Sequence, residues 1–182
     1  MKSVRNLGSY PAAMSIAADD ILEFHAARLL LLFRLCGTKD RIDGLTKMAK
    51  LDFFVRYPQF FSRVSAHLRR DDTAAPGVIE SSMVRHHYGP WDKRYYHVLA
   101  YLEGTGLLEV TKTGSAFQFE LTPQGRRLAD SLKEKDAFKP LANQMKVVKQ
   151  ELGTKSGSVL KKLIYQVFAK EVADKTRGEV IT

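Results

Sequence analysis

A stretch near the middle of the chain constrains the fold most, because its hydrophobic pattern changes from a helical period to an alternating one. Apolar residues first recur every three or four positions, which predicts a helix from Asp92 to about Glu103. Two short alternating segments follow at residues 107–112 and 116–121, with Gly114 between them. They predict two strands joined by a tight turn, because glycine readily adopts the backbone angles that such turns need.

A second helix is expected directly after this hairpin. Thr122 is a favoured N-cap residue, and Pro123 suits the first helical position, where its missing N–H costs nothing. Leu128 and Leu132 are expected to face inward from this helix. Helix, hairpin and helix in this order are typical of a winged helix-turn-helix. The sequence therefore predicts a mainly α-helical fold with a small β-hairpin, in which a winged helix-turn-helix core is flanked by extra helices.

The segment from residue 20 to Cys36 is the most apolar part of the chain. Its apolar residues cover most of a helical circumference, with Asp19 or Asp20 suited to the N-cap and Gly37 to the end. A helix of this kind must be packed on several sides. Burial in the core of this chain and contact with a partner protein both explain the pattern.

Further helices are expected on both sides of the winged-helix part, at residues 43–57, 59–70, 140–152 and 158–172. Residues 71–77 are the clearest loop, residues 78–87 are expected to be helical or irregular, and Gly89 and Pro90 are expected to form a turn. The pattern divides the chain into an N-terminal segment (1–19), an N-terminal helical part (20–75), the winged-helix part (76–138) and C-terminal helices (139–182).

The chain is basic, since 29 Lys and Arg residues against 20 Asp and Glu residues give a formal net charge of +9. Residues 1–110 carry 15 basic and 12 acidic residues, a net charge of +3, and the remainder carries 14 and 8, a net charge of +6. Cations on the hairpin and the last helices, such as Lys112, suit contacts with phosphates. Solvated lysines that keep a small protein soluble explain the excess equally well, so DNA is a candidate partner that the sequence leaves open.

Cysteine usage and motif content bear on chemistry and location. The single cysteine, Cys36, cannot form an intrachain disulfide, and beside an apolar helix it is expected to be a packed, unreactive thiol. We find no P-loop, His-Glu-x-x-His or Gly-x-Ser-x-Gly motif, and adjacent His86 and His87 make a poor pair of metal ligands. The sequence predicts no catalytic residues, no metal and no cofactor. It also predicts a cytoplasmic protein without an export signal or a membrane span.

The string from residue 83 to residue 96 is the most unusual in the chain. It combines the only tryptophan with three of the seven tyrosines and several cations. Aromatic residues with arginine are typical of interface hot spots, and the cations also suit phosphates. Packing of Trp91 and Tyr95 beneath the helix is the alternative. The candidate residues for binding a partner or DNA are Arg85, His86, Tyr88, Trp91, Lys93, Arg94 and, on the hairpin, Lys112.

A second candidate surface lies in the helix predicted at residues 158–172. Apolar and aromatic side chains recur there at helical spacing and form one face. We expect this face to be a partner-binding helix, with the residues Leu160, Leu163, Ile164, Tyr165 and Phe168.

Several strings of the sequence carry a resemblance to a known family. They are Leu-Thr-Lys-Met-Ala-Lys-Leu-Asp-Phe-Phe-Val-Arg-Tyr-Pro at 45–58, Met-Val-Arg at 83–85, Tyr-Gly-Pro-Trp-Asp at 88–92, Arg-Tyr-Tyr at 94–96, Leu-Thr-Pro-Gln-Gly at 121–125 and Leu-Lys-Lys-Leu-Ile-Tyr at 160–165. With these strings in this order, from about residue 21 to residue 181, the chain resembles the middle component of bacterial three-component ABC systems. These systems include the small accessory subunit of Lamassu-type SMC defence complexes.

The resemblance implies a non-catalytic accessory subunit of an anti-phage or anti-plasmid complex. In such systems an SMC- or Rad50-like ATPase senses DNA, a separate effector such as a nuclease does the damage, and the small subunit binds the ATPase heads. The implied partners of this chain are therefore that ATPase and effector. The residues leave one alternative open, a stand-alone winged-helix transcription regulator with Lys93, Arg94 and His97 at base edges.

Overall fold

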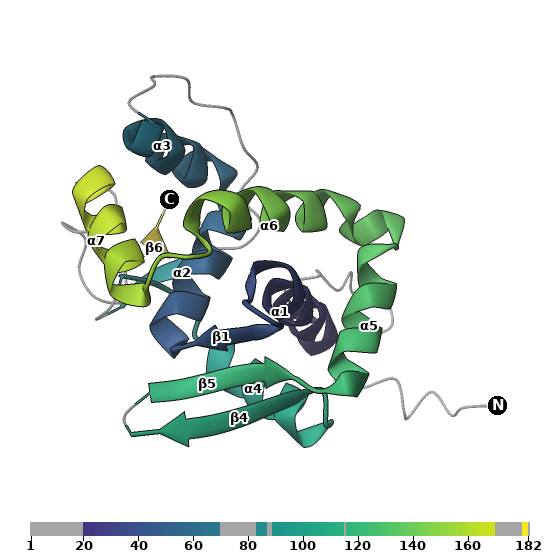
Figure 1. Cartoon of the computed structure of the whole chain (residues 1–182). Coiled ribbons are helices and arrows are strands. Elements are labelled where there is room, and N and C mark those ends of the chain that lie inside the picture. Colours follow the sequence, from purple (N-terminus) through teal and green to yellow (C-terminus); the bar gives the residue numbers. More distant parts are fainter. Residues whose placement is uncertain (1–19, 70–82, 87–88, 115, 170–179, 182) are drawn as a thin grey trace.

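The computed structural model describes residues 20–69, 83–86, 89–114, 116–169 and 180–181. Within this part the chain is mainly helical, with seven α-helices and two small antiparallel sheets (Figure 1). None of the helices described there combines the length and the hydrophobicity that a bilayer span requires.

The helices are α1 (Leu22–Cys36), α2 (Leu45–Arg56), α3 (Pro58–Arg69), α4 (Tyr95–Gly104), α5 (Pro123–Lys133), α6 (Lys139–Leu152) and α7 (Gly157–Val167). The strands are β1 (Arg41–Asp43), β2 (Met83–His86), β3 (Gly89–Trp91), β4 (Leu108–Thr113), β5 (Ala116–Leu121) and β6 (Val180–Ile181). A short 3-10 helix at Asp136–Phe138 precedes α6.

Strands β4 and β5 form the predicted hairpin, and Gly114 in its turn has a positive φ of 63°. The sequence reading missed β1, which pairs with β5 through Ile42 and Phe119 and gives the sheet the order β1-β5-β4. Three residues are too few to show an alternating pattern, and the last of them, Asp43, was predicted to begin a helix. Its pairing depends on a partner strand that lies far away in the sequence.

Helix α1 lies at the centre of the molecule, with α5 and α6 packed against it (Figure 1). Five successive residues, Leu29–Phe33, are all buried, and five residues exceed one helical turn. Burial within this chain therefore accounts for the all-round apolar pattern. Gly37 ends the helix as predicted, but Ile21 is the N-cap and makes no side-chain cap hydrogen bond. Asp20 is therefore not the N-cap, and Asp19, the alternative predicted cap, lies outside the described residues.

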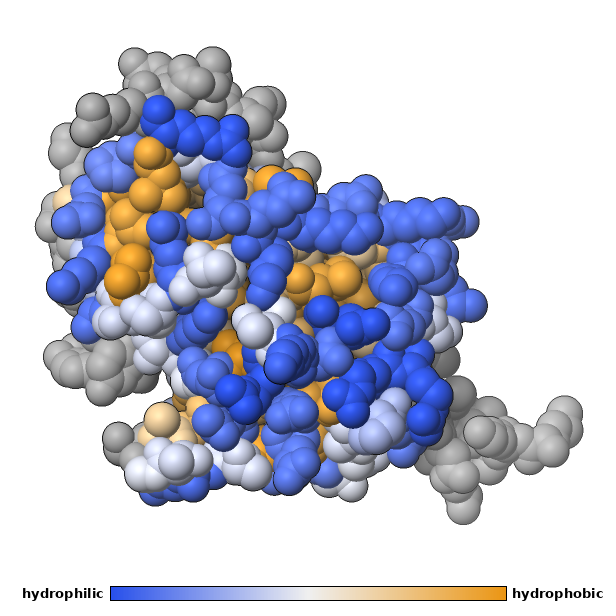
Figure 2. Space-filling view, in the orientation of Figure 1, coloured by the Kyte–Doolittle hydropathy of each residue, from blue (hydrophilic) through white to orange (hydrophobic). Residues whose placement is uncertain are grey.

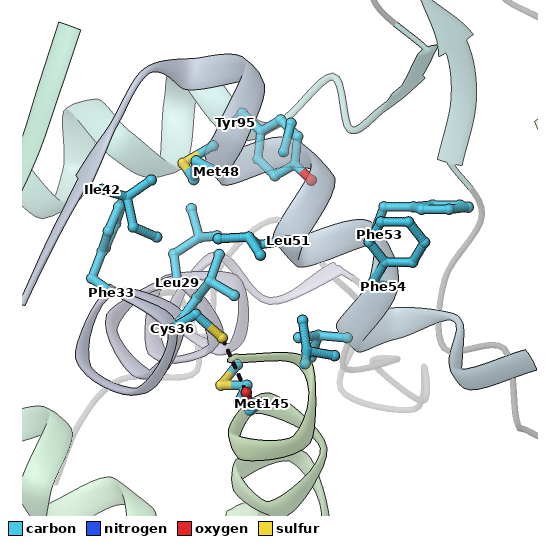
Figure 3. Close-up of a cluster of buried hydrophobic side chains, with 14 of the residues drawn as sticks. Leu29, Phe33, Cys36, Ile42, Met48, Leu51, Phe53, Phe54, Tyr95 and Met145 are labelled. Carbon is cyan, nitrogen blue, oxygen red and sulfur yellow. Dashed lines mark hydrogen bonds between the residues drawn. The ribbon is translucent and has the colours of Figure 1, made fainter. Parts of the chain in front are cut away.

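Cys36 closes this core where α1 meets α6 (Figure 3). Its Sγ donates a hydrogen bond to the Met145 carbonyl oxygen at 3.3 Å. Burial raises the pKa of the thiol to about 12, so it stays protonated near neutral pH. The prediction that Cys36 is packed in the core is confirmed, and its lack of reactivity stays a prediction.

Helix α5 begins as the sequence predicts. The Thr122 hydroxyl accepts a hydrogen bond from the Gly125 N–H at 3.0 Å, and Pro123 occupies the first turn. The inward orientation predicted for Leu128 is wrong, because 39% of this residue is exposed, whereas Leu132 packs partly against the core. Helix α5 packs against α1, and Gly125 and Ala129 are its buried residues.

The second sheet, in the order β3-β2-β6, replaces two expected features. The part of 78–87 that the structure describes is a strand rather than a helix or irregular chain, and residues 78–82 lie outside it. Gly89 and Pro90 belong to β3, which pairs with β2, rather than to an isolated turn. Pro90 is tolerated because β3 is an edge strand.

The C-terminal helices agree with the prediction except at one end. Helix α7 ends at Val167 and Phe168 is buried in the core, while residues 170–172 of the predicted helix lie outside the described residues. The parts predicted at 20–75 and 76–138 share one sheet through β1 and β5, and one hydrophobic cluster runs through both. The loop predicted at residues 71–77 lies outside the described residues.

Candidate functional site

A buried ionic network is the main concentration of polar chemistry in the described part of the chain. It joins α1, α2 and the beginning of α4, and all its members except Arg94 are buried. Charged side chains are costly to bury unless they are paired and hydrogen-bonded, so each contact is informative. The members are His25, Arg28, Asp52, Arg56, Asp92, Arg94 and Tyr95.

Asp52 on α2 is one of the two carboxylates of the buried ionic network. It accepts a hydrogen bond from Arg28 Nε at 3.0 Å and one from the Tyr95 hydroxyl at 2.7 Å. Arg56, one turn further along α2, places Nη1 3.7 Å from the same carboxylate. Asp52 thereby connects α1 and α2 to the first residue of α4.

Asp92, the second carboxylate, lies between β3 and α4. It accepts hydrogen bonds from Arg56 Nη1 at 2.8 Å and from Arg94 Nε and Nη2 at 2.9 and 2.8 Å. The Arg94 backbone N–H adds another at 2.9 Å. Burial alone would raise the pKa of Asp92, but these hydrogen bonds and the two guanidinium charges outweigh it and hold the pKa well below its usual range.

His25 lies between two guanidinium groups. Its Nδ1 is 2.8 Å from Arg28 Nη1 and its Nε2 is 2.9 Å from Arg94 Nη1. Arginine can only donate, and a neutral imidazole accepts at one ring nitrogen, so the ring accepts from one of these two neighbours at a time. The imidazole thus links α1 to the loop that starts α4.

Lys50 on α2 is a further buried cation close to this network. Its Nζ donates a hydrogen bond to the Pro90 carbonyl oxygen at 2.8 Å. Burial, with a smaller contribution from the Lys161 charge, lowers the pKa of Lys50 to about 7. Gly89 has a positive φ of 92°, a conformation that favours glycine, and a Cβ there would make only an ordinary contact with Nζ at 3.5 Å. Lys50 therefore tethers β3 to α2.

Of the buried ionic network, Arg94, Tyr95 and the predicted helix start Asp92 stand out in the sequence, and the other members do not. Arg28 lies in the most apolar segment of the chain, and its sequence neighbours do not indicate a partner. Asp52 and Arg56 are four positions apart in a stretch of buried apolar residues, and that spacing was the available signal. Nothing in the local sequence shows that Asp92 reaches Arg56, because that contact spans 36 positions.

The prediction that Trp91 is an interface residue is wrong. Trp91 is only 5% exposed and packs against Tyr95, with ring centroids 5.2 Å apart. Arg94 is held by Asp92 and His25 within the chain and so is a structural residue as well. Lys93 and Lys112 are exposed, as binding residues must be. Arg85 and His86 lie in β2, where only the backbone is described, and Tyr88 lies outside the described residues.

The partner-binding face predicted on α7 also needs correction. Leu160, Leu163, Ile164 and Phe168 are buried against the rest of this chain, because α7 packs on α2 and α3. Phe168, for example, meets Phe60 edge to face at 4.7 Å. Tyr165 is half-buried, and Lys161 lies 5.8 Å from its ring. These residues form core rather than a free surface.

The helix α4 and the hairpin enclose an apolar groove that the sequence reading did not identify. We call it the α4–hairpin groove, and its volume is about 170 Å³. Two aromatic residues on its walls are largely exposed, Tyr96 at 65% and Phe117 at 41%. The residues that line it are Leu45, Tyr96, Leu99, Ala100, Glu103, Val110, Phe117 and Phe119.

Other parts of the surface differ from this groove. On the face shown in Figure 2, hydrophilic residues cover much of α5, α6 and the hairpin, and apolar atoms gather over α3 and α7. Among the described residues, no group of three or more His, Cys, Asp or Glu side chains is arranged to hold a metal ion.

Comparison with protein-family models, with curated proteins and with solved structures finds no match to this chain.

Proposed function

We propose that the chain is a non-catalytic accessory subunit of a bacterial anti-phage or anti-plasmid defence complex, working in the cytoplasm. In this proposal it binds an SMC- or Rad50-like ATPase and helps to control an effector such as a nuclease. The sequence strings at residues 45–58, 88–92 and 160–165 support the family, and the surface of the fold supports binding to a protein.

In this proposal, the central part of the chain is a winged helix. Its elements α1, β1, α2, α4, β4 and β5 follow one another in the order of that fold, and the sheet order β1-β5-β4 is the one that a winged helix has. In this assignment α3 and the second sheet are an insertion between α2 and α4. Helix α4 then takes the position of the recognition helix, and the β4–β5 hairpin is the wing.

The observation that carries the proposal is the composition of α4. Tyr95–Gly104 contains no lysine or arginine, and its exposed positions include Tyr96, His97, Ala100 and Glu103. A recognition helix that reads DNA places arginine, lysine, asparagine or glutamine against base edges and phosphates. An exposed tyrosine beside an apolar groove is the composition of a protein interface instead.

The alternative is a stand-alone winged-helix regulator that binds DNA. The exposed cations Lys93, at the start of α4, and Lys112, on the wing, favour it because they flank the recognition position and suit phosphate contacts. These two lysines also suit an acidic protein surface. The alternative predicts a symmetric dimer that protects an operator from cleavage.

Co-expression tests the two functions against each other. The chain is produced with the SMC-like ATPase and the effector encoded beside it, and the mass of the assembly is measured by light scattering after gel filtration. A stoichiometric complex with the ATPase supports the proposal. A chain that purifies alone and has no affinity for the ATPase head domain contradicts it.

Footprinting of the isolated chain on DNA from its own gene neighbourhood supplies the second arm. Sequence-specific protection that is lost in Lys93→Glu/Lys112→Glu, but kept in the exposed control Lys135→Glu/Lys146→Glu, would favour the regulator. Absent or uniform protection excludes it.

A further inference from the structure

We infer that the α4–hairpin groove is the docking site for an amphipathic helix of the partner protein, which places apolar side chains in the groove and an acidic residue at its Lys93–Lys112 end. This inference rests on the proposed function, because it assumes a protein partner. It adds where that partner binds and what chemistry its binding segment must have.

The shape of the groove fits side chains of a macromolecule. Its volume of about 170 Å³ is below the roughly 300 Å³ at which cavities for cofactors and drug-sized ligands begin. Leu99, Val110 and Phe119 line its inner part, and the exposed rings of Tyr96 and Phe117 stand at its walls. Aromatic anchors beside a small pocket are the typical centre of a protein interface.

The apolar surface of the wing continues outward from the core. Leu108 pairs with Leu121, and Val110 with Phe119, so these side chains share one face of the hairpin. Phe117 extends the same face toward the turn and stacks on Phe119 with ring centroids 6.3 Å apart. Phe117 is 41% exposed, whereas Phe119 and Leu121 on the same face are buried, and Lys112 Nζ lies 5.6 Å from the centre of its ring.

The charges around the groove are distributed unevenly along its length. The short connection from Gly104 to Leu108 makes α4 and β4 run in opposite directions, so the α4 N-terminus and the hairpin turn lie at the same end. Lys93 and Lys112 are at that end, where the helix dipole adds positive potential. Glu103 is at the other end. A complementary segment therefore carries its acidic residue at the lysine end.

A helix fits this site better than an added strand. Strand addition needs free backbone N–H and C=O groups along an open edge, whereas the α4–hairpin groove is lined by side chains of α4, of one face of the hairpin and of Leu45 on α2. Apolar residues three or four positions apart on a helix would enter the groove between Tyr96 and Phe117. We therefore commit to an amphipathic helix of the ATPase as the occupant.

Affinity measurements with the purified ATPase head domain test the inference. The variant Tyr96→Ser/Phe117→Ser is compared with Leu128→Ser/Val159→Ser, which removes two other exposed apolar residues, 39% and 43% exposed, from α5 and α7. We expect the groove variant to raise the Kd at least tenfold and the control variant to change it less than twofold. Circular dichroism melting of both variants checks that the fold is kept.

Charge reversal tests the orientation of the bound helix. Lys93→Glu/Lys112→Glu is expected to weaken binding at least tenfold at low salt, and less in 0.5 M salt, because screening removes the attraction. Glu103→Gln is expected to leave the Kd within a factor of two. Equal losses in both variants would contradict the proposed polarity.

A photo-crosslinking amino acid at position 117, with position 128 as control, identifies the occupant. Crosslinks to an acidic amphipathic helix of the ATPase support the inference. Crosslinks to a second copy of this chain, or to DNA, overturn it. If the wild-type chain and the groove variant bind the ATPase equally well, the docking site is wrong and the proposed function stands. If the wild-type chain does not bind the ATPase, the proposed function itself fails.

Discussion

Arg28 on α1 donates through Nε to Asp52 on α2 at 3.0 Å, and both side chains are almost fully excluded from solvent. The pair lies beside Asp92 and Tyr95, so it ties the two central helices to the start of α4. Helix α4 forms one wall of the groove. Residues far from the surface therefore decide the position of the proposed interface.

Breaking this pair is expected to destabilise the protein strongly. Arg28→Met leaves the Asp52 carboxylate buried without its closest cation and is expected to lower the free energy of unfolding by about 3–5 kcal/mol. Urea denaturation measures the loss. Arg41→Met breaks the exposed Arg41–Asp43 pair and serves as the control, with an expected change below about 1 kcal/mol. Similar losses in the two variants would show that the buried pair contributes no more to the free energy of unfolding than the exposed pair does.

Lys50 is expected to make stability depend on pH. The pKa of Lys50 is about 7 in the folded state and near 10.5 in the unfolded state, so the unfolded chain binds more protons between these values and stability rises with pH. The cost of charging Lys50 is fully present below pH 7. The difference between 10.5 and about 7 corresponds to roughly 5 kcal/mol.

Lys50→Met removes this cost. It also leaves the Pro90 carbonyl without its hydrogen-bond donor, and that loss offsets about 1–3 kcal/mol of the gain in stability. We expect the variant to be more stable than wild type at pH 6, and its advantage to shrink by pH 9.5. Urea titrations at both pH values check this, with the exposed Lys146→Met as control. A constant difference between wild type and Lys50→Met at the two pH values would contradict the assignment.

Gly125 is expected to tolerate no side chain. A Cβ there would lie 2.0 Å from the Leu107 carbonyl oxygen, which belongs to the backbone and cannot move aside cheaply. We expect Gly125→Ala to destabilise the protein by about 2 kcal/mol or more, because the helix α5 must shift away from the hairpin. Gly104→Ala is the control, since nothing lies within 4 Å of its Cβ position. Thermal melting should separate the two variants clearly.

Cys36 is expected to resist thiol reagents in the native protein. Its pKa of about 12 and its burial leave almost no accessible thiolate at pH 8. Labelling by a disulfide reagent should be complete in 6 M guanidinium chloride and should follow the rate of unfolding in buffer. Rapid labelling of the native protein would show that α1 and α6 separate readily.

Local sequence signals predicted some elements well. Thr122 and Pro123 specify the start of α5 through a side-chain cap and a fixed φ, and both act within four residues. Gly114 and the alternating residues around it specify the hairpin in the same local way. The apolar pattern of α1 predicted that the helix is buried, although it did not decide whether other parts of this chain or a partner protein would pack against it.

The candidate surfaces were predicted less well, because exposure depends on what packs against each residue. Trp91 and Phe168 have the composition of an interface, and both are buried by elements distant in the sequence. Phe117, an ordinary strand residue in the sequence, is left exposed because the core ends at Phe119. The groove is formed by side chains of α4 and the hairpin that only the tertiary structure brings together.

The sequence by itself determined most of the helices, the hairpin, the cap of α5 and the basic charge, because short-range hydrogen bonding and hydrophobic periodicity specify the structural features within a few residues. Only the tertiary structure decided that β1 joins β5, that Arg28 and Asp52 meet in the core, and which apolar faces remain open. Those features depend on contacts between residues separated by tens of positions, and only the packed chain brings such residues together.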